Sequence, residues 1–210
     1  VGDAVLKFLY PAKCCLCEGI GRPDVCEECL AECAESESSP DLRSGPVSLV
    51  DAVFPYEGRP AQAVRRLKYD RATGLWKWMS SRLRDRFESQ DLGARYDLVV
   101  PVPLAKGRLG ERGFNQSELL ASGLTDVRTD LLKRIRETPP QVNLDVTTRR
   151  ANLAAAFSCT EEVKGRSVLL VDDVYTTGAT AEACALCLAS AGALTVGVLT
   201  FCKVKEPVGP

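Results

Sequence analysis

The segment that most constrains the fold is residues 168–180, VLLVDDVYTTGAT. Its first four residues, 168–171, are apolar, and a run this short is typical of a strand buried on both faces, as in a parallel sheet. Two carboxylates, Asp172 and Asp173, follow, and a glycine-punctuated loop rich in threonine comes next. Residues 181–191 are apolar and helix-prone, so the segment predicts a strand, a tight loop and a helix in that order.

This order of elements creates a site for an anion. Backbone N–H groups of the loop and of the first helical turn converge where the helix dipole is positive, and the threonine hydroxyls add donors. Such a site can hold a phosphate monoester without a lysine. The aspartates at the strand end are acceptors suited to vicinal hydroxyls. A ribose 5-phosphate with free 2- and 3-hydroxyls would therefore satisfy both the anion site and the two aspartates.

Two other interpretations explain part of the segment. The receiver domain of a signalling protein also has an apolar strand that ends in two aspartates, but that strand opens its domain, and only residues 181–210 follow here. A buried strand with an acidic turn is the simpler alternative, because hydroxyl-rich loops at helix starts are often only caps. The whole arrangement of residues 168–180 favours the sugar-phosphate site over either.

Length and composition limit the class of protein and its chemistry. The 210 residues, 45% of them hydrophobic, are enough for one substantial core and a small appendage. The sequence contains no histidine, which excludes Ser-His-Asp and Cys-His nucleophilic catalysis and histidine-ligated metals. No apolar run approaches the length of a membrane span and no signal peptide opens the sequence, so we expect a cytoplasmic protein.

Two Cys-x-x-Cys pairs near the amino terminus have the spacing of a compact four-cysteine zinc site; they are Cys14 with Cys17 and Cys26 with Cys29. In a cytosolic protein a metal is favoured over disulfides. Because Cys15 and Cys33 are also present, the choice among Cys14, Cys15 and Cys17 as ligands is open. We expect structural Zn2+ in a finger with its linker at residues 1–46, followed by a main domain at residues 47–210.

The charges are unevenly distributed although the net charge is −1. Acidic residues outnumber basic ones in residues 1–46, whereas arginine and lysine dominate residues 59–86. Apolar residues at helical spacing predict helices at 61–69 and 73–87, with most of the cations on the opposite side. These cations form either a solvated face or a surface for nucleic-acid phosphates, for which the candidates are Arg65, Arg66, Lys68 and Arg71.

A second buried strand is predicted at residues 97–104, and two prolines require the chain to leave the sheet near Pro101. A basic segment with three glycines follows, and its cations are Lys106, Arg108 and Arg112. Such a segment suits a mobile lid that brings hydrogen-bond donors to a bound ligand, and an ordinary basic surface loop is the alternative. Asn115 and Glu118 then predict the start of a helix at 116–123.

Residues 168–180 closely resemble the signature of type I phosphoribosyltransferases that binds phosphoribosyl pyrophosphate (PRPP). The resemblance implies an α/β fold with a mostly parallel sheet flanked by helices. It implies that Asp172 and Asp173 bind the ribose hydroxyls and act with Arg112 in catalysis, and that Mg2+ binds with PRPP. The 5-phosphate would lie on Thr176, Thr177, Gly178, Ala179 and Thr180, and the pyrophosphate on Val102, Lys106, Arg108 and Arg112.

Blocks along nearly the whole chain look like the ComF family of competence-associated phosphoribosyltransferase-domain proteins. They are the four cysteines and residues 67–69, 99–104, 108, 112–116, 138–141, 149–152, 156–157 and 168–180. The resemblance implies a cytosolic bacterial protein of natural transformation, with a zinc finger beside a phosphoribosyltransferase domain, that handles single-stranded DNA together with other DNA-uptake proteins. Ala105 and Lys106 stand where many members carry a histidine.

The activity implied is a Mg2+-dependent transfer of the phosphoribosyl group from PRPP to an acceptor, with release of pyrophosphate. Thr176 stands where hypoxanthine and guanine salvage enzymes have an aspartate that serves the purine, which argues against that class of acceptor. The alternative is a non-catalytic module that senses PRPP or binds nucleic acid. A purely structural zinc adaptor would leave residues 168–180 unexplained.

Overall fold

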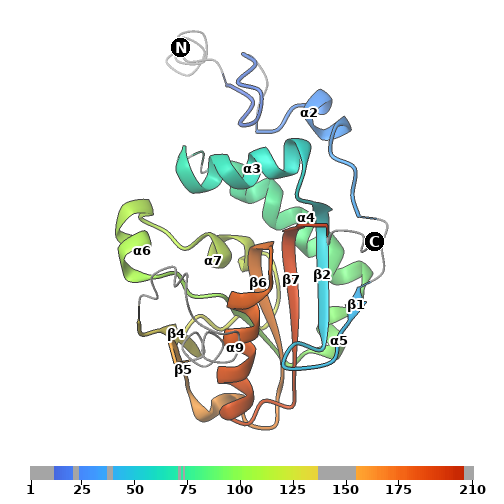
Figure 1. Cartoon of the computed structure of the whole chain (residues 1–210). Coiled ribbons are helices and arrows are strands. Elements are labelled where there is room, and N and C mark those ends of the chain that lie inside the picture. Colours follow the sequence, from blue (N-terminus) through green and yellow to red (C-terminus); the bar gives the residue numbers. More distant parts are fainter. Residues whose placement is uncertain are drawn as a thin grey trace, which may run out of the picture.

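A five-stranded sheet in the order β1-β2-β7-β6-β3 forms the centre of the molecule (Figure 1). The computed structural model describes residues 12–20, 24–36, 40–70, 72, 74–136 and 155–205. The parallel strands are β2 (Leu49–Pro55), β7 (Thr195–Lys203), β6 (Ser167–Tyr175) and β3 (Leu98–Pro101). The edge strand β1 (Asp41–Leu42) is antiparallel to β2. This arrangement confirms the expected α/β fold with a mostly parallel sheet.

Both faces of the sheet are buried, which explains the continuous apolar runs in the sequence. One face packs against α3 (Gly58–Tyr69), α4 (Leu75–Ser89), α5 (Leu92–Arg95) and α7 (Gln116–Ala121). The other packs against α9 (Ala179–Ser190) and a small hairpin of β4 (Leu132–Arg134) and β5 (Phe157–Cys159), which η1 (Glu161–Val163) follows. Along β6, Leu169 and Val171 belong to the first core and Val168 and Leu170 to the second. Consecutive side chains of β6 therefore enter opposite cores.

Two boundaries differ from the sequence prediction for local reasons. Helix α3 begins at Gly58, earlier than the predicted 61–69, because Pro60 is tolerated in a first helical turn where its missing N–H is not needed. The segment expected to be only a linker contains β1, which pairs Asp41 with Val50 and so extends the sheet by a strand. None of the helices in the described ranges is both long and apolar enough to cross a membrane.

The amino-terminal cysteine segment packs on the first core. It comprises a loop and the short helix α2 (Glu27–Ala31), and it lies beside α3 (Figure 1). Leu16, 1% exposed, belongs to the same buried cluster as Phe54 and Leu67. The segment therefore packs its apolar residues into the core of the main sheet, as expected for a segment too short and polar to form a core of its own.

Some predicted features lie outside the described residues. They are Arg71 and the family blocks at 138–141 and 149–152.

Candidate functional site

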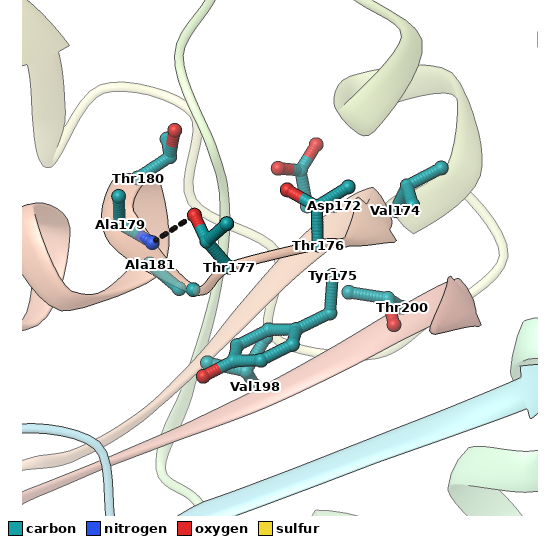
Figure 2. A pocket seen from close by; sticks show the side chains of 11 residues that line it. Asp172, Val174, Tyr175, Thr176, Thr177, Ala179, Thr180, Ala181, Val198 and Thr200 are labelled. Atoms are coloured by element: carbon teal, nitrogen blue, oxygen red, sulfur yellow. Dashed lines mark hydrogen bonds between the residues drawn. The ribbon is translucent and has the colours of Figure 1, made fainter. Parts of the chain in front are cut away.

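A small cavity lies at the carboxyl end of β6, where the chain turns into α9 (Figure 2). Its volume is about 60 Å³, which suits a small polar group such as a phosphate rather than a whole nucleotide. The lining combines Asp172, Val198 and Thr200 with residues 174–181. All five predicted phosphate-loop residues, 176–180, are therefore brought together with one of the two predicted acids.

The loop has the conformation that its glycine permits. Gly178 lies immediately before α9 in the left-handed region, with φ of 78°. A β-carbon at this position would overlap the hydroxyl group of Tyr175, which is itself buried. The guanidinium of Arg43 covers the Tyr175 ring at 5.3 Å from its centroid. The Thr177 hydroxyl accepts a long hydrogen bond of 3.5 Å from the Ala179 N–H at the start of α9. The shape of the cavity thus depends on a residue without a side chain at position 178.

Asp172 is the acid that faces the cavity. Its Oδ1 accepts hydrogen bonds of 2.8 Å from the Ser117 hydroxyl and from the Asp173 N–H. Burial, and then the charge of Asp173, raise the pKa of Asp172 to about 7, although these hydrogen bonds and Lys68 act in the opposite direction. Because both hydrogen bonds engage Oδ1, the second carboxylate oxygen is left to accept from a ligand.

Asp173 lies on the other side of β6 and does not line the cavity. It is 3% exposed, and its Oδ2 forms an ion pair of 2.8 Å with Nζ of Lys68, in the last turn of α3. No hydrogen-bond donor reaches this buried oxygen from the rest of the described chain. The two acids, grouped by the sequence prediction, therefore have different surroundings in the structure.

The basic segment expected to be a lid loop is a helix, α6 (Lys106–Arg112). The helix tolerates glycines in its interior. Gly113 ends α6 in the left-handed region, with φ of 80°. Lys106 and Arg108 are exposed, and neither lines the Asp172 cavity. Lys106 instead borders a separate groove of about 390 Å³, which also contacts Asn115 and Lys133. Because residues 106–112 form a helix, the expectation of a loop was wrong.

The other two residues predicted to bind pyrophosphate are held by contacts within the protein. The Arg112 guanidinium stacks over the Tyr69 ring at 5.5 Å and donates to Oε1 of Gln116 at 3.1 Å. Val102 is buried; its N–H donates to the Val171 carbonyl, and its own carbonyl accepts from the Asn115 side chain. Arg112 thus contacts α7 through Gln116, the residue before Ser117, and it does not line the Asp172 cavity.

Ser117, which joins α7 to Asp172, is a residue of the site that was not predicted from the sequence. The predicted helix start is confirmed, because Asn115 caps α7 by accepting from the Ser117 N–H at 3.1 Å. This cap turns the Ser117 hydroxyl of the first turn toward β6. A serine two residues after a cap carries no pattern of its own, so only the three-dimensional arrangement identifies it.

The residues proposed to contact nucleic acid have different environments. Arg66 donates to the Leu16 carbonyl at 2.8 Å and pairs with Glu18, and Lys68 pairs with Asp173. Arg65 is exposed and borders a shallow hollow that also includes Arg66 and Glu18. Two of these cations therefore have partners inside the protein, and Arg65 faces the solvent.

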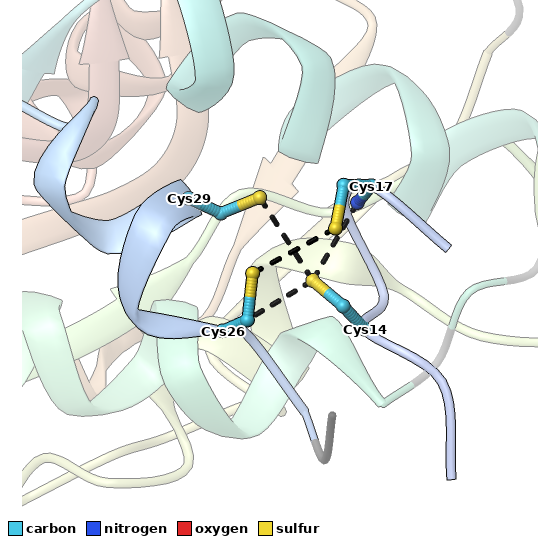
Figure 3. Close-up of side chains that lie close together, drawn as sticks. All are labelled: Cys14, Cys17, Cys26 and Cys29. Carbon is cyan, nitrogen blue, oxygen red and sulfur yellow. Dashed lines mark hydrogen bonds between the residues drawn. The ribbon is translucent and has the colours of Figure 1, made fainter. Parts of the chain in front are cut away.

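Four cysteines of the amino-terminal segment form a candidate metal centre (Figure 3). Their sulfur atoms all lie within 4.8 Å of one another, with Sγ–Sγ distances of 3.9 Å for Cys14–Cys29 and 3.7 Å for Cys17–Cys26. Zinc bound tetrahedrally by thiolates at about 2.3 Å places them about 3.8 Å apart. The four sulfurs therefore have the spacing that the metal requires.

The surroundings of Cys14 favour a thiolate. Burial opposes its ionisation, but the N–H groups of Cys17, Cys26 and Leu16 point at its sulfur from 3.4 to 3.5 Å and lower the pKa to about 6. Cys33 donates instead to the Cys29 carbonyl, and Cys15 packs against Gly74. Of the six cysteines in this segment, the structure brings together Cys14, Cys17, Cys26 and Cys29 as a group that could hold a metal ion, and four thiolates are typical of a closed structural site.

Comparison with known proteins places this fold and site in a family. Residues 110–210 match the family described as phosphoribosyl transferase domain. The competence protein ComFC of Bacillus subtilis strain 168 is 30% identical over 191 residues, which cover 89% of this chain and 75% of that protein. This chain belongs to the ComF family. The ComF resemblance drawn from the sequence blocks is therefore confirmed.

Other relatives of this ComF chain match over shorter ranges. The DNA utilization protein YhgH of Escherichia coli O157:H7 is 39% identical over 112 residues, 51% of this chain and 49% of that protein. The chain thus spans about half the length of these YhgH relatives. The competence protein F of Haemophilus influenzae strain Rd is 40% identical over 92 residues, which cover 40% of each protein. The match to the phosphoribosyl transferase domain, residues 110–210, contains β6, the loop 176–180 and α9.

Proposed function

We propose that this ComF protein binds PRPP at the carboxyl end of β6. The observation that carries the proposal is the cavity in which Asp172 faces the loop 176–180 and the amino end of α9. The loop and helix amides would hold the 5-phosphate, because α9 directs its positive end at the cavity. The free oxygen of Asp172 would accept hydrogen bonds from the ribose hydroxyls.

The pyrophosphate would then lie on the α6 and α7 side, where Arg112 donates to Gln116, the residue before Ser117. Arg112 would leave the Tyr69 ring to pair with it, and Lys106, Arg108 and the backbone of Val102 remain further candidates. Carboxylate and phosphate oxygens are the ligands that Mg2+ prefers, so the metal would bind together with PRPP beside Asp172. Mg2+ would supply charge neutralisation for the departing pyrophosphate.

Transfer of the phosphoribosyl group to an acceptor is the activity that this arrangement supports. Its oxocarbenium-like transition state would benefit from donors fixed around the leaving pyrophosphate. A PRPP-sensing module without transferase activity remains the second candidate, because Lys106 and Arg108 lie away from the cavity that contains Asp172. Incubation of the protein with PRPP, Mg2+ and a panel of bases distinguishes the two candidates, because only a transferase releases pyrophosphate.

The direct test of PRPP binding is calorimetric titration of the protein with PRPP and Mg2+. Above the Asp172 pKa of about 7, where this carboxyl group is ionised, Asp172→Asn keeps the size of the side chain and an oxygen for Ser117 but removes the charge that attracts the hydroxyl groups. We expect affinity to fall at least about tenfold, since hydrogen bonds to a charged group contribute roughly 1.5–3 kcal/mol each. The matched control is Asp130→Asn, which removes an exposed acid that pairs with Arg128. Equal affinity in all three proteins would contradict the proposal.

The four-cysteine cluster is proposed to hold structural Zn2+, because its sulfur spacing and N–H donors fit the metal. We propose residues 1–46 as the metal-binding unit and residues 47–210 as the phosphoribosyltransferase-like domain. We propose a cytoplasmic location together with the metal, because a reducing compartment favours thiolate ligation over disulfides.

A role in DNA uptake is proposed from the relatives, whose names include competence proteins and a DNA utilization protein. Single-stranded DNA and other DNA-uptake proteins are the partners that this role implies. Arg65 is the exposed member of the predicted nucleic-acid surface. Contacts with several phosphates would make oligonucleotide affinity fall steeply with rising salt, and binding that is absent at low salt would exclude the role.

A further inference from the structure

We propose that α6 (Lys106–Arg112), with Tyr69 at one of its ends and Lys133 at the other, is the surface that binds single-stranded DNA. The inference rests on the proposed role in DNA uptake and names the residues that would contact the strand. It moves the main nucleic-acid surface from α3, where the sequence analysis expected it, to the helix that was expected to be a lid loop.

Helix α6 presents positive charge that the fold itself does not use. None of its residues is buried, and it lies at the edge of the molecule (Figure 1). Its seven residues contain three cations, Lys106, Arg108 and Arg112, and a single acid, Glu111. No acid among the described residues pairs with Lys106 or Arg108. On α3, by contrast, Arg66 pairs with Glu18 and Lys68 with Asp173, so less of the charge of that helix is available to an external anion.

An exposed aromatic ring lies at the carboxyl end of α6. Tyr69, the last residue of α3, is 72% exposed. The Arg112 guanidinium stacks over its ring at 5.5 Å and is held in turn by Gln116, which is 6% exposed. The ring is thus fixed from one side, and most of its surface remains open. Such rings are stacking platforms for the bases of single-stranded nucleic acids, particularly beside an arginine.

A groove of about 390 Å³ lies at the amino end of α6, and its volume is within the range of sites that bind small organic ligands. One acid, Glu118, lines it together with three cations, which are Lys106, Lys133 and Arg134. Two apolar side chains of the lining, Leu109 and Ile135, are 42% and 57% exposed. A nucleotide unit of a strand matches this lining, because its phosphate suits the cations and its base suits the apolar side chains.

The groove and the ring are joined by one short row of cations. Lys106 and Arg112 are six residues apart on α6, which corresponds to about 9 Å along the helix axis. A polymer that carries a charge and a planar base in every unit can contact both ends of this row. An acidic peptide would also be attracted by the cations, but it lacks a planar base in every unit for the Tyr69 ring. Single-stranded DNA is therefore the occupant that fits all three features.

The test is the affinity for a labelled oligothymidylate, measured by fluorescence anisotropy over a range of salt concentrations. PRPP is left out, because Arg112, Arg108 and Lys106 are also candidates for its pyrophosphate. Lys133→Gln removes one phosphate contact, so we expect weaker binding and a salt dependence whose slope is smaller by about 0.7. Tyr69→Ala should weaken binding about fivefold to a hundredfold at an unchanged slope, since stacking involves no charge, and Tyr69→Phe should retain the affinity.

Two variants serve as controls. Lys77→Gln removes an exposed lysine of α4 and should leave both affinity and slope unchanged. Arg65→Gln removes the exposed cation of α3 and should change the slope less than Lys133→Gln does. An abasic strand keeps the phosphates but has no bases. The original protein should bind it more weakly than oligothymidylate, and Tyr69→Ala should reduce this difference.

The inference is overturned if Tyr69→Ala and Lys133→Gln bind oligothymidylate as the original protein does, or if polyglutamate displaces the strand as well as unlabelled oligothymidylate does. If melting temperatures show that a variant does not fold, photocrosslinking of the original protein to a strand with 5-bromouracil decides. Adducts at Tyr69, α6 or β4 support the inference, and adducts only elsewhere overturn it. An original protein that binds no oligonucleotide at low salt would refute the proposed DNA role as well, whereas binding that the variants leave unchanged refutes the inference alone.

Discussion

Gly178 is the residue on which the shape of the phosphate cavity depends most directly. Its φ of 78° is unfavourable for any residue with a side chain, and a β-carbon there would overlap Tyr175. Gly165 provides a natural comparison, because its φ is 71° but the space around its missing β-carbon is open. The two glycines have the same backbone requirement, but only at Gly178 does the added carbon meet another residue.

Replacing each glycine by alanine separates backbone strain from the loss of the site. Gly165→Ala should lower the free energy of unfolding by about 1–2 kcal/mol, the usual cost of a left-handed residue with a side chain, and leave PRPP affinity unchanged. Gly178→Ala should destabilise the protein further and weaken PRPP binding at least about tenfold, because Tyr175 and the loop must move. Denaturant unfolding and calorimetry measure the two effects. Equal PRPP affinity in the two variants would contradict this view of the loop.

Helix α3 is the element that joins the candidate metal centre to the candidate sugar-phosphate site. At its amino end Arg59 pairs with Glu32 at 2.9 Å, and further along Arg66 contacts Leu16 and Glu18 of the cysteine loop. At its carboxyl end Lys68 pairs with Asp173. Helix α3 therefore contacts both the cysteine segment and the end of β6.

The four-cysteine cluster is predicted to bind zinc. We expect about one zinc per chain, and Cys17→Ser should lose the metal because it removes one of four ligands. Cys15→Ser is the matched control, since its sulfur lies outside the cluster against Gly74. Metal analysis gives the zinc content, and the melting temperature should fall for Cys17→Ser but little for Cys15→Ser. Loss of zinc from both variants would show that the ligand set is wrong.

The elements that sequence predicted best are those with a strong local pattern. The apolar run 168–171 gave a buried parallel strand, and its threonine- and glycine-rich continuation gave the loop and α9. The paired cysteines were also found, because metal ligands are fixed by spacing. Helix α6 was mistaken for a loop, because its glycines weigh against a helix in any local pattern.

The parts of the site that sequence could not provide depend on contacts between distant segments. Ser117 meets Asp172 and Lys68 meets Asp173 across long stretches of chain, and neither pair has a periodicity or spacing to reveal it. The neighbouring aspartates looked equivalent in sequence. They differ because consecutive residues of a strand face opposite sides of the sheet.

At the scale of the whole molecule, the acidic and the basic stretches of the sequence form ion pairs with each other. Acids of the amino-terminal segment pair with cations of α3 and α4, and the pairs are Glu18 with Arg66, Glu32 with Arg59 and Glu35 with Arg82. Arg86 of α4 also forms a buried pair of 2.7 Å with Asp51 of β2. Three arginines of the basic stretch thus hold the amino-terminal segment against α3 and α4.

The central claim is that a sugar phosphate binds where β6 ends, and a crystal structure with PRPP and Mg2+ tests it most directly. We predict electron density for the 5-phosphate within about 3 Å of the loop amides of residues 176–180, with the ribose hydroxyls on Asp172. Saturating PRPP that leaves this cavity empty, or that binds with its phosphate elsewhere on the molecule, would contradict the account.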